Sequence, residues 1–361
     1  MEKIGYINNI RVFATISVIV LHTSFPIFIY GFSLTPSINW WIGNVFDSAT
    51  HSCVPLFVMI TGALFLSKEI EIKSFFKKRF MRILFPFLFW SFIYIVSEAY
   101  LSHHVQGTNF FENIWYSNFF VRLLKGQISF HLWYIYMLIG LYLFIPILNK
   151  WIRNCTEKEI LYFLGIWLIT IIMSYGFVAN RLDSKLLPVY FSGYIGYLVL
   201  GYYLSRIDTY QLSRSLLAKV NNKNIQRSIY LLVAFITFLT TVFGVYFNSM
   251  RLGRLCEYYF CEDLTINVLL ITVGIFLFIK TFNFTNKIFL WIINTINKYS
   301  YGIYLVHILV LTYLSRFGIK ATFIHPLIGI PVTVVLCTAI STLMVFVVFK
   351  IPFRKYISGG N

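Results

Sequence analysis

Long apolar stretches recur along the whole chain and are separated by short polar segments. About 20 consecutive apolar residues, folded as an α-helix, span the roughly 30 Å hydrocarbon core of a bilayer. The pattern therefore predicts an all-α polytopic membrane protein, a bundle of about ten transmembrane helices. We place these helices near 7–30, 51–67, 83–101, 131–149, 160–176, 189–205, 228–247, 264–282, 300–316 and 326–349.

The distribution of positive charge predicts how this bundle is oriented. Of the 30 Lys and Arg residues, 22 lie at the N-terminus, in every second connector and at the C-terminus, and 8 lie in the opposite connectors. Because connectors rich in positive charge stay in the cytoplasm, both termini are predicted there. No polar segment is long enough for a separate soluble domain. We expect one transmembrane domain over 1–350 and a short cytoplasmic tail over 351–361.

Composition supports the membrane class and argues against a nucleic-acid partner. Hydrophobic residues make up 58% of the 361 positions and charged residues 12%, whereas a soluble domain carries about twice that share of charge. The net charge of +17 is spread over short connectors instead of being gathered on one soluble domain. A nucleic-acid-binding protein shows a concentrated basic surface. Membrane lipids are therefore the expected surroundings.

Cysteine and histidine spacing predicts no metal site. Cys256 and Cys261 share one connector and would pair in an oxidising compartment, although two separate thiols are an equally good interpretation. His103 and His104 are adjacent but have no further ligands at zinc spacing. His51 and His325 lie at the ends of connectors on the predicted outer side, where exposure to solvent would explain them.

Two ionisable residues, Arg11 and His22, lie in the first apolar stretch. Eleven positions at about 100° each make about three helical turns, so both side chains share one face, about 16 Å apart. Ionisable groups are costly inside a bilayer, and a functional site is the default hypothesis. A neutral His22 can act as a general base toward a hydroxyl group. The alternatives are a packing hydrogen bond for His22 and anchoring to lipid phosphates for Arg11.

Arg79 and Arg82 precede the third apolar stretch and are three positions apart. At that spacing they share a helix face. Two guanidinium groups can hold a phosphate through charge-assisted hydrogen bonds. The alternative is the ordinary positive charge of a cytoplasmic connector.

Aromatic and histidine side chains form two further groups. His131, Trp133 and Tyr134 open the fourth span from the outer side, where aromatic faces can stack on a sugar ring. The alternative is an ordinary interfacial belt. Tyr304 and His307 are three positions apart, about half-way through the ninth span, and point the same way. We predict that these five residues contact the substrate.

In their order along the chain these motifs resemble the acyltransferase-3 family of membrane-bound acyltransferases. The motifs are Arg-x10-His, Arg-x-x-Arg, His-Leu-Trp-Tyr and Ser-Tyr-Gly-Ile-Tyr-Leu-Val-His. The run from Val54 to Gly62 is most similar to the branch of the enterobacterial common antigen O-acetyltransferase. The resemblance extends from residue 1 to about 350.

The resemblance implies an O-acetyltransferase in the bacterial cytoplasmic (inner) membrane. Such an enzyme moves an acetyl group from cytoplasmic acetyl-CoA to a hydroxyl of a cell-surface polysaccharide or lipid-linked glycan. The resemblance implies that His22 is the catalytic base or acyl relay and that Arg11 supports it or steers the CoA moiety. It places Arg79 and Arg82 at the acyl-CoA entrance. Asn8 stands where many members carry an Asp, so an acidic partner for Arg11 is not expected there.

A protein of another class remains as the alternative. A proton-coupled exporter of a polysaccharide or small solute would use His22 and His307 as proton relays. It would move substrate without any need for acetyl-CoA. The sequence has no clear inverted repeat or pair of broken helices, and it therefore favours the enzyme.

Overall fold

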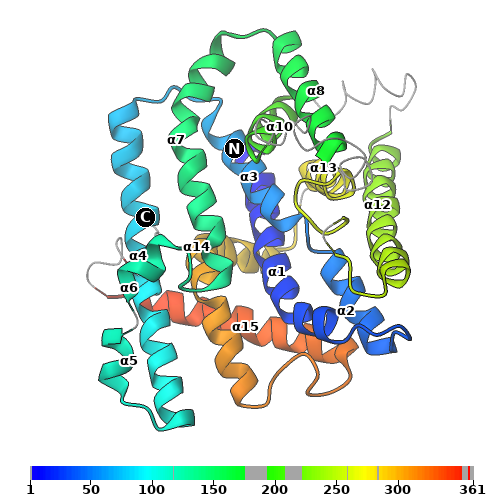
Figure 1. Cartoon of the computed structure of the whole chain (residues 1–361). Helices are drawn as coiled ribbons and strands as arrows, with labels where there is room; N and C mark the ends of the chain where they lie inside the picture. The colour runs from blue at the N-terminus through cyan, green and yellow to red at the C-terminus, as the bar shows by residue number, and fades with distance from the viewer. Residues whose placement is uncertain are drawn as a thin grey trace. The chain divides into compact units, whose positions relative to one another are not determined.

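The computed structural model describes residues 2–116, 118–174, 193–207, 222–257, 259–282, 284–351 and 357. Within these ranges every regular element is a helix (Figure 1), as the sequence predicted. The elements are α1 (Glu2–Tyr30), α2 (Ile38–Ser48), α3 (Cys53–Phe65), α4 (Ile72–Gln106), α5 (Phe110–Tyr116), α6 (Phe119–Leu124), η1 (Phe130–Leu132), α7 (Trp133–Asn154), α8 (Glu157–Ser174), α10 (Ile195–Arg206), α12 (Lys223–Leu252), α13 (Ile266–Lys280), α14 (Lys287–Arg316) and α15 (Pro326–Val348).

Among the described residues, six helical segments are long and apolar enough to cross a membrane. They are Gly5–Tyr30, Ile38–Phe65, Ile72–Gln106, Phe130–Asn154, Lys223–Leu252 and Pro326–Val348. The chain is therefore a multi-pass membrane protein. Helices α8, α10, α13 and α14 coincide with predicted spans but are not among the six. The count of ten spans and the cytoplasmic side of both termini stay predictions.

Several helices differ from the sequence prediction. Helices α5 and α6 lie in a segment that we treated as a connector, and α14 begins at Lys287 instead of residue 300. Helix α2 lies in a segment that we treated as a connector, and it joins α3 in one candidate span, Ile38–Phe65. Helix α4 begins at Ile72 instead of residue 83 and continues to Gln106. It ends where Gly107 adopts a left-handed conformation, with φ of 68°, which glycine accepts without a steric penalty. Of the predicted tail over 351–361, residues 352–356 and 358–361 lie outside the described part.

The helices form two compact units. The first comprises Met1–Glu69, Ile147–Asn297 and Ile319–Val334, and the second comprises Ile70–Pro146, Lys298–Gly318 and Val335–Asn361. Helices α7, α14 and α15 contribute residues to both. The single transmembrane domain over 1–350 stays a prediction.

Helices α3 and α10 of the first unit approach each other through a pair of glycines. A Cβ atom on Gly62 would overlap the carbonyl group of Leu198, and one on Gly201 would overlap the backbone of Met59. Small residues allow such close backbone approach, which is a main source of helix association in membranes. Helix α1 packs against α2, α3 and α13, and α12 packs against α13 and α2.

A buried asparagine closes the C-terminal end of α3. The amide nitrogen of Asn149 donates to the carbonyl oxygens of Phe65, Leu66 and Lys68, at 3.0, 3.1 and 2.6 Å. The last carbonyl groups of a helix have no partner within the helix. Asn149 therefore satisfies groups that would be costly to leave unpaired in a membrane.

In the second unit, polar tips of aromatic side chains connect separate helices. The Tyr301 hydroxyl donates to the carbonyl oxygen of Ile83 at 2.8 Å, which links α14 to α4. The Trp90 indole donates to the carbonyl oxygen of Ile357 at 3.1 Å. The first of these bonds joins α4 to the C-terminal half of α14, and these two helices carry Tyr94, Tyr304 and His307 of the histidine–tyrosine cluster described below.

Candidate functional site

The side chain of Arg11 forms a hydrogen bond with another residue of the protein. The arginine side chain is half-buried on α1, and its Nη1 donates to the Oδ1 atom of Asn297 at 2.7 Å. Asn297 belongs to the part of α14 that lies in the first unit. An arginine that only anchored the helix to lipid phosphates would not need this contact. The bond therefore favours a role within the protein for the guanidinium group.

His22 lies on the same helix as Arg11, with no break between them. Helix α1 is continuous from Glu2 to Tyr30, so the spacing of eleven residues places both side chains on one face, as predicted. His22 is half-buried. The hydroxyl groups of the next two residues, Thr23 and Ser24, donate to carbonyl oxygens of α1 itself, at 2.7 and 2.9 Å.

A buried cluster in the second unit combines three of the predicted substrate residues. The rings of His131 and His307 meet edge to face, with centroids 5.1 Å apart. The Tyr304 hydroxyl donates to the carbonyl oxygen of His131. Tyr94, which sequence reasoning missed, joins them: its hydroxyl donates to the carbonyl oxygen of Leu305 at 3.0 Å and lies 3.5 Å from Nε2 of His131. We call these four residues, Tyr94, His131, Tyr304 and His307, the histidine–tyrosine cluster.

Hydrogen bonds orient both imidazole rings of this cluster. Nδ1 of His307 lies 2.6 Å from the carbonyl oxygen of Tyr304. A carbonyl can only accept, so Nδ1 carries the proton and Nε2 is the basic nitrogen of the neutral ring. Nδ1 of His131 lies 2.9 Å from the hydroxyl of Ser129. The cluster therefore holds two imidazoles in defined orientations, an arrangement suited to binding hydroxyl groups or relaying protons.

The other two predicted substrate residues, Trp133 and Tyr134, differ in exposure, although their ring centroids lie only 6.5 Å apart. Tyr134 is buried, and its ring lies 5.3 Å from that of Tyr304. Trp133 is 43% exposed. The two are adjacent in the first turn of α7, where neighbouring side chains point about 100° apart. The structure thus buries four of the five predicted residues and leaves Trp133 partly exposed at the edge of the group.

A cavity of about 350 Å³ adjoins this cluster. It shares Tyr94 with the cluster and is also lined by Ser129, which contacts His131. Its other polar lining residues include Ser97, Glu98, Thr312 and Arg316. They belong to the ends of α4 and α14 that the charge distribution places on the outer side. The cavity is therefore a candidate entrance for a polar acceptor.

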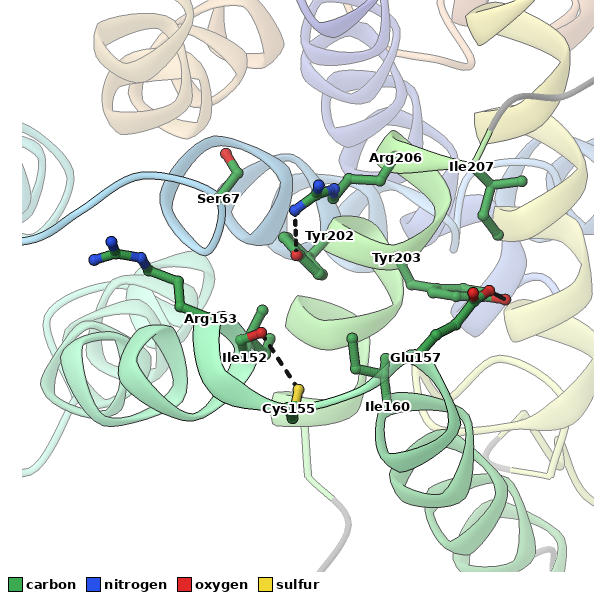
Figure 2. Close-up of a pocket in the computed structure, with 10 residues that line it drawn as sticks. All are labelled: Ser67, Ile152, Arg153, Cys155, Glu157, Ile160, Tyr202, Tyr203, Arg206 and Ile207. Carbon is green, nitrogen blue, oxygen red and sulfur yellow. Dashed lines mark hydrogen bonds between the residues drawn. The ribbon is translucent and has the colours of Figure 1, made fainter.

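A larger cavity, of about 730 Å³, lies in the first unit (Figure 2). Arg153 comes to it from the end of α7, and Tyr202 and Arg206 from the end of α10. Nη1 of Arg206 donates to the Tyr202 hydroxyl at 2.7 Å. All three residues lie at predicted cytoplasmic ends of helices. From the sequence, both arginines were counted only as the positive charge of cytoplasmic connectors. The sequence does not show that the ends of α7 and α10 meet.

Cys155 and Glu157 also line this cavity, and neither is suited to nucleophilic chemistry there. Burial raises the pKa of the Cys155 thiol, and its Sγ donates to the carbonyl oxygen of Ile152 at 3.3 Å. A thiol needs a lowered pKa to react as a thiolate. Glu157 accepts a hydrogen bond from Tyr203 at 3.2 Å. Positive charge in the cavity is partly balanced by carboxylates, because Arg153 forms an ion pair with Glu69 at 3.4 Å and Glu157 lines the wall. The cavity is thus a binding site in character, and Arg206 is its candidate contact for an anionic ligand.

Arg79 and Arg82 lie near the start of α4, and both are half-buried. They belong to one continuous helix, so the predicted shared face is confirmed. Their contact with a donor stays a prediction.

These features describe a helical, multi-pass membrane protein with buried histidines and two polar cavities. The model of a protein family described as an acyltransferase domain matches residues 4–345. The chain therefore belongs to the acyltransferase-3 family and is a membrane acyltransferase. Comparison with curated proteins and with solved structures gave no match.

Proposed function

We propose that this protein is an O-acetyltransferase of the bacterial cytoplasmic membrane. It would move an acetyl group from cytoplasmic acetyl-CoA to a hydroxyl of a cell-surface polysaccharide or lipid-linked glycan. The family match over residues 4–345 carries the proposal, and the placement of Arg11 and His22 on one continuous helix supports it. The run from Val54 to Gly62 supports the branch of the enterobacterial common antigen O-acetyltransferase.

His22 is the proposed general base. Its imidazole accepts the proton of the acceptor hydroxyl while that oxygen attacks the thioester carbonyl of acetyl-CoA. The carbon–sulfur bond then breaks, and the imidazolium returns the proton to the departing CoA thiolate. An acetyl-histidine relay is the alternative. Labelled protein formed from labelled acetyl-CoA without acceptor would identify the relay.

Two places in the protein are candidates for binding the phosphate groups of the donor, acetyl-CoA. Arg79 and Arg82 offer two guanidinium groups on one face of α4. The larger cavity offers Arg153 and Arg206 together with Tyr202, in a space of about 730 Å³ that suits the nucleotide end of CoA. Pocket volumes for small ligands run from about 300 to 1,000 Å³. Both pairs lie on the predicted cytoplasmic side, where acetyl-CoA is made.

The acceptor is proposed to bind at the histidine–tyrosine cluster and its adjoining cavity. Sugar hydroxyl groups both donate and accept hydrogen bonds, and the cavity presents Ser97, Glu98, Ser129 and Thr312. The Tyr94 ring supplies apolar surface beside these groups, and the Tyr134 ring packs against Tyr304 of the cluster. Aromatic surface next to hydroxyl and carboxylate groups is the usual character of a polar-ligand site.

Purified protein, labelled acetyl-CoA and extracted glycolipid provide the test. The wild-type protein should transfer label to the glycan, and His22→Ala should slow transfer by about 10²–10⁴-fold. His325→Ala is the matched control. This exposed histidine precedes α15, and among the described residues its hydrogen bonds are those that its backbone oxygen accepts from Ile328 and Gly329. Wild-type transfer by His22→Ala at normal membrane levels would remove His22 from the mechanism.

The alternative function, a proton-coupled exporter, predicts the opposite result for the same protein. Sealed vesicles would accumulate or release glycan without acetyl-CoA, and no label would reach the glycan. The family assignment favours the enzyme. Glycan movement without any acetyl transfer would overturn the proposed function.

A further inference from the structure

Three residues that the acyl-transfer proposal does not use meet in the first unit. Asp47 lies in the last turn of α2, His51 in the turn that leads to α3, and Cys261 in the connector between α12 and α13. One carboxylate oxygen, one imidazole nitrogen and the thiol sulfur all lie within 4.8 Å of one another. We expected His51 to be solvated at the end of a connector; instead its Nε2 is 2.7 Å from Oδ2 of Asp47.

Asp47 is the least satisfied member of this group. Its side chain is 0% exposed, and its second oxygen, Oδ1, has no hydrogen-bond partner within the described part of the chain. Leaving a buried polar atom unpaired costs about 1–3 kcal/mol, and more when the group is charged. A cation bound between Asp47 and its neighbours would remove this cost.

Backbone hydrogen bonds hold the three side chains in place. The amide nitrogen and hydroxyl of Thr50 both donate to the carbonyl oxygen of Asp47, at 3.0 and 2.8 Å. This tight turn sets the i, i+4 approach of His51 to Asp47. In the other connector, the amide nitrogens of Phe260 and Cys261 donate to the carbonyl oxygen of Glu257, at 3.0 and 2.8 Å. The side chains of Asp47, His51 and Cys261 therefore project from turns that are held by hydrogen bonds.

The chemical types of the three donor atoms indicate which metal ion the group would bind. Thiolate and imidazole ligands favour zinc, whereas calcium and magnesium prefer oxygen ligands alone. In a tetrahedral zinc site, bonds of roughly 2.0–2.3 Å place the donor atoms roughly 3.3–3.8 Å apart. The three donor atoms lie within 4.8 Å of one another, and the hydrogen-bonded pair of His51 Nε2 and Asp47 Oδ2, now 2.7 Å apart, opens to roughly 3.3 Å when the ion enters. With Asp47 ionised, His51 neutral and Cys261 deprotonated, the three ligands carry two negative charges. Zn²⁺ would make the buried set neutral.

We propose that Asp47, His51 and Cys261 bind one zinc ion. On binding, the proton of the Cys261 thiol and any proton on His51 are released to solvent. Water takes the fourth position. The ion would tie the turn between α2 and α3 to the connector between α12 and α13. The site is separate from the acyl-transfer residues and is independent of the proposed function.

The competing interpretation is a His–Asp pair beside an apolar thiol. Cys261 does pack in an apolar cluster with Phe28, Trp40 and Val245. Metal content distinguishes the two. The detergent-purified full-length chain is stripped with a chelator, incubated with Zn²⁺, passed through a desalting column and analysed for metal. Wild-type protein should retain about one zinc per chain, and Cys261→Ser and Asp47→Asn should retain at least about tenfold less.

Cys256→Ser is the matched control, because this buried cysteine lies in the same connector but is not one of the three ligands. It should keep the wild-type metal content. Loading with Co²⁺ should give a thiolate-to-cobalt charge-transfer absorption in wild type and Cys256→Ser, and none in Cys261→Ser. Size-exclusion profiles verify that each variant is folded. Wild-type protein without retained zinc, or a Cys261→Ser variant that keeps both metal and absorption, would overturn the proposal.

Discussion

The guanidinium group of Arg11 donates to the side-chain oxygen of Asn297 at 2.7 Å, across 286 positions of sequence. This bond connects the first helix to α14 within the first unit. Asn8, which stands in the place of an acid in many relatives, is not the partner that this bond uses. A neutral amide from another helix holds Arg11 instead.

Removing that amide should weaken the enzyme without removing Arg11. A hydrogen bond to a charged group contributes about 1.5–3 kcal/mol, so Asn297→Ala should reduce acetyl transfer by roughly tenfold if the orientation of Arg11 matters. Initial rates with labelled acetyl-CoA measure this. Asn39→Ala, an exposed asparagine on α2, is the control and should be neutral. Equal rates for both variants would show that Asn297 does not position Arg11 for the reaction.

The larger cavity predicts a donor-binding effect. Arg206→Gln removes a positive charge at the Tyr202 hydroxyl, and it should raise KM for acetyl-CoA roughly tenfold with little change in kcat. Arg82→Gln makes the corresponding test on α4. Arg254→Gln, an exposed residue after α12, is the control. An effect of Arg82→Gln alone would place the phosphates on α4, and an effect of Arg206→Gln alone would place them in the cavity.

The histidine–tyrosine cluster predicts an acceptor effect. Tyr304→Phe removes the hydrogen bond to the carbonyl oxygen of His131 but keeps the aromatic ring. Loss of one interhelical hydrogen bond in a membrane protein costs about 0.6–1.7 kcal/mol. We therefore expect a thermal midpoint only slightly below wild type and a rise in KM for the glycan of roughly threefold to tenfold. Tyr162→Phe, which changes an exposed tyrosine on α8, should alter neither quantity.

The contact between α3 and α10 predicts a stability effect. A methyl group on Gly201 would overlap the backbone of Met59. Forcing extra volume into such a contact typically costs about 1–3 kcal/mol. Gly201→Ala should therefore lower the thermal midpoint of the detergent-purified protein. Gly165→Ala on α8, where a Cβ atom meets nothing within 4 Å, should leave the midpoint unchanged or raise it. A Gly201→Ala midpoint equal to wild type would contradict the close approach.

The local sequence pattern was sufficient to predict most of the helices and the placement of Arg11 and His22 along one face of the first helix. Apolar length predicted helices at each of the ten ranges, and α1 confirmed that Arg11 and His22 share a face. The same reasoning missed α2, because its polar positions Asn44, Asp47 and Ser48 read as a connector. In the structure all three are buried: the Asn44 amide donates to the carbonyl oxygen of Val242 at 3.1 Å, and the Ser48 hydroxyl donates to Asn44 Oδ1 at 3.0 Å.

The sequence by itself determined the helical class, the membrane setting and the family, because each depends on properties repeated along the chain: apolar length, charge distribution and motif order. Only the tertiary structure decided which residues meet. The bond from Arg11 to Asn297, the cavity between Arg153 and Arg206, and the group of Asp47, His51 and Cys261 each join segments distant in sequence. Such contacts depend on which helix faces pack together, and helical periodicity within a single segment carries no information about its partner.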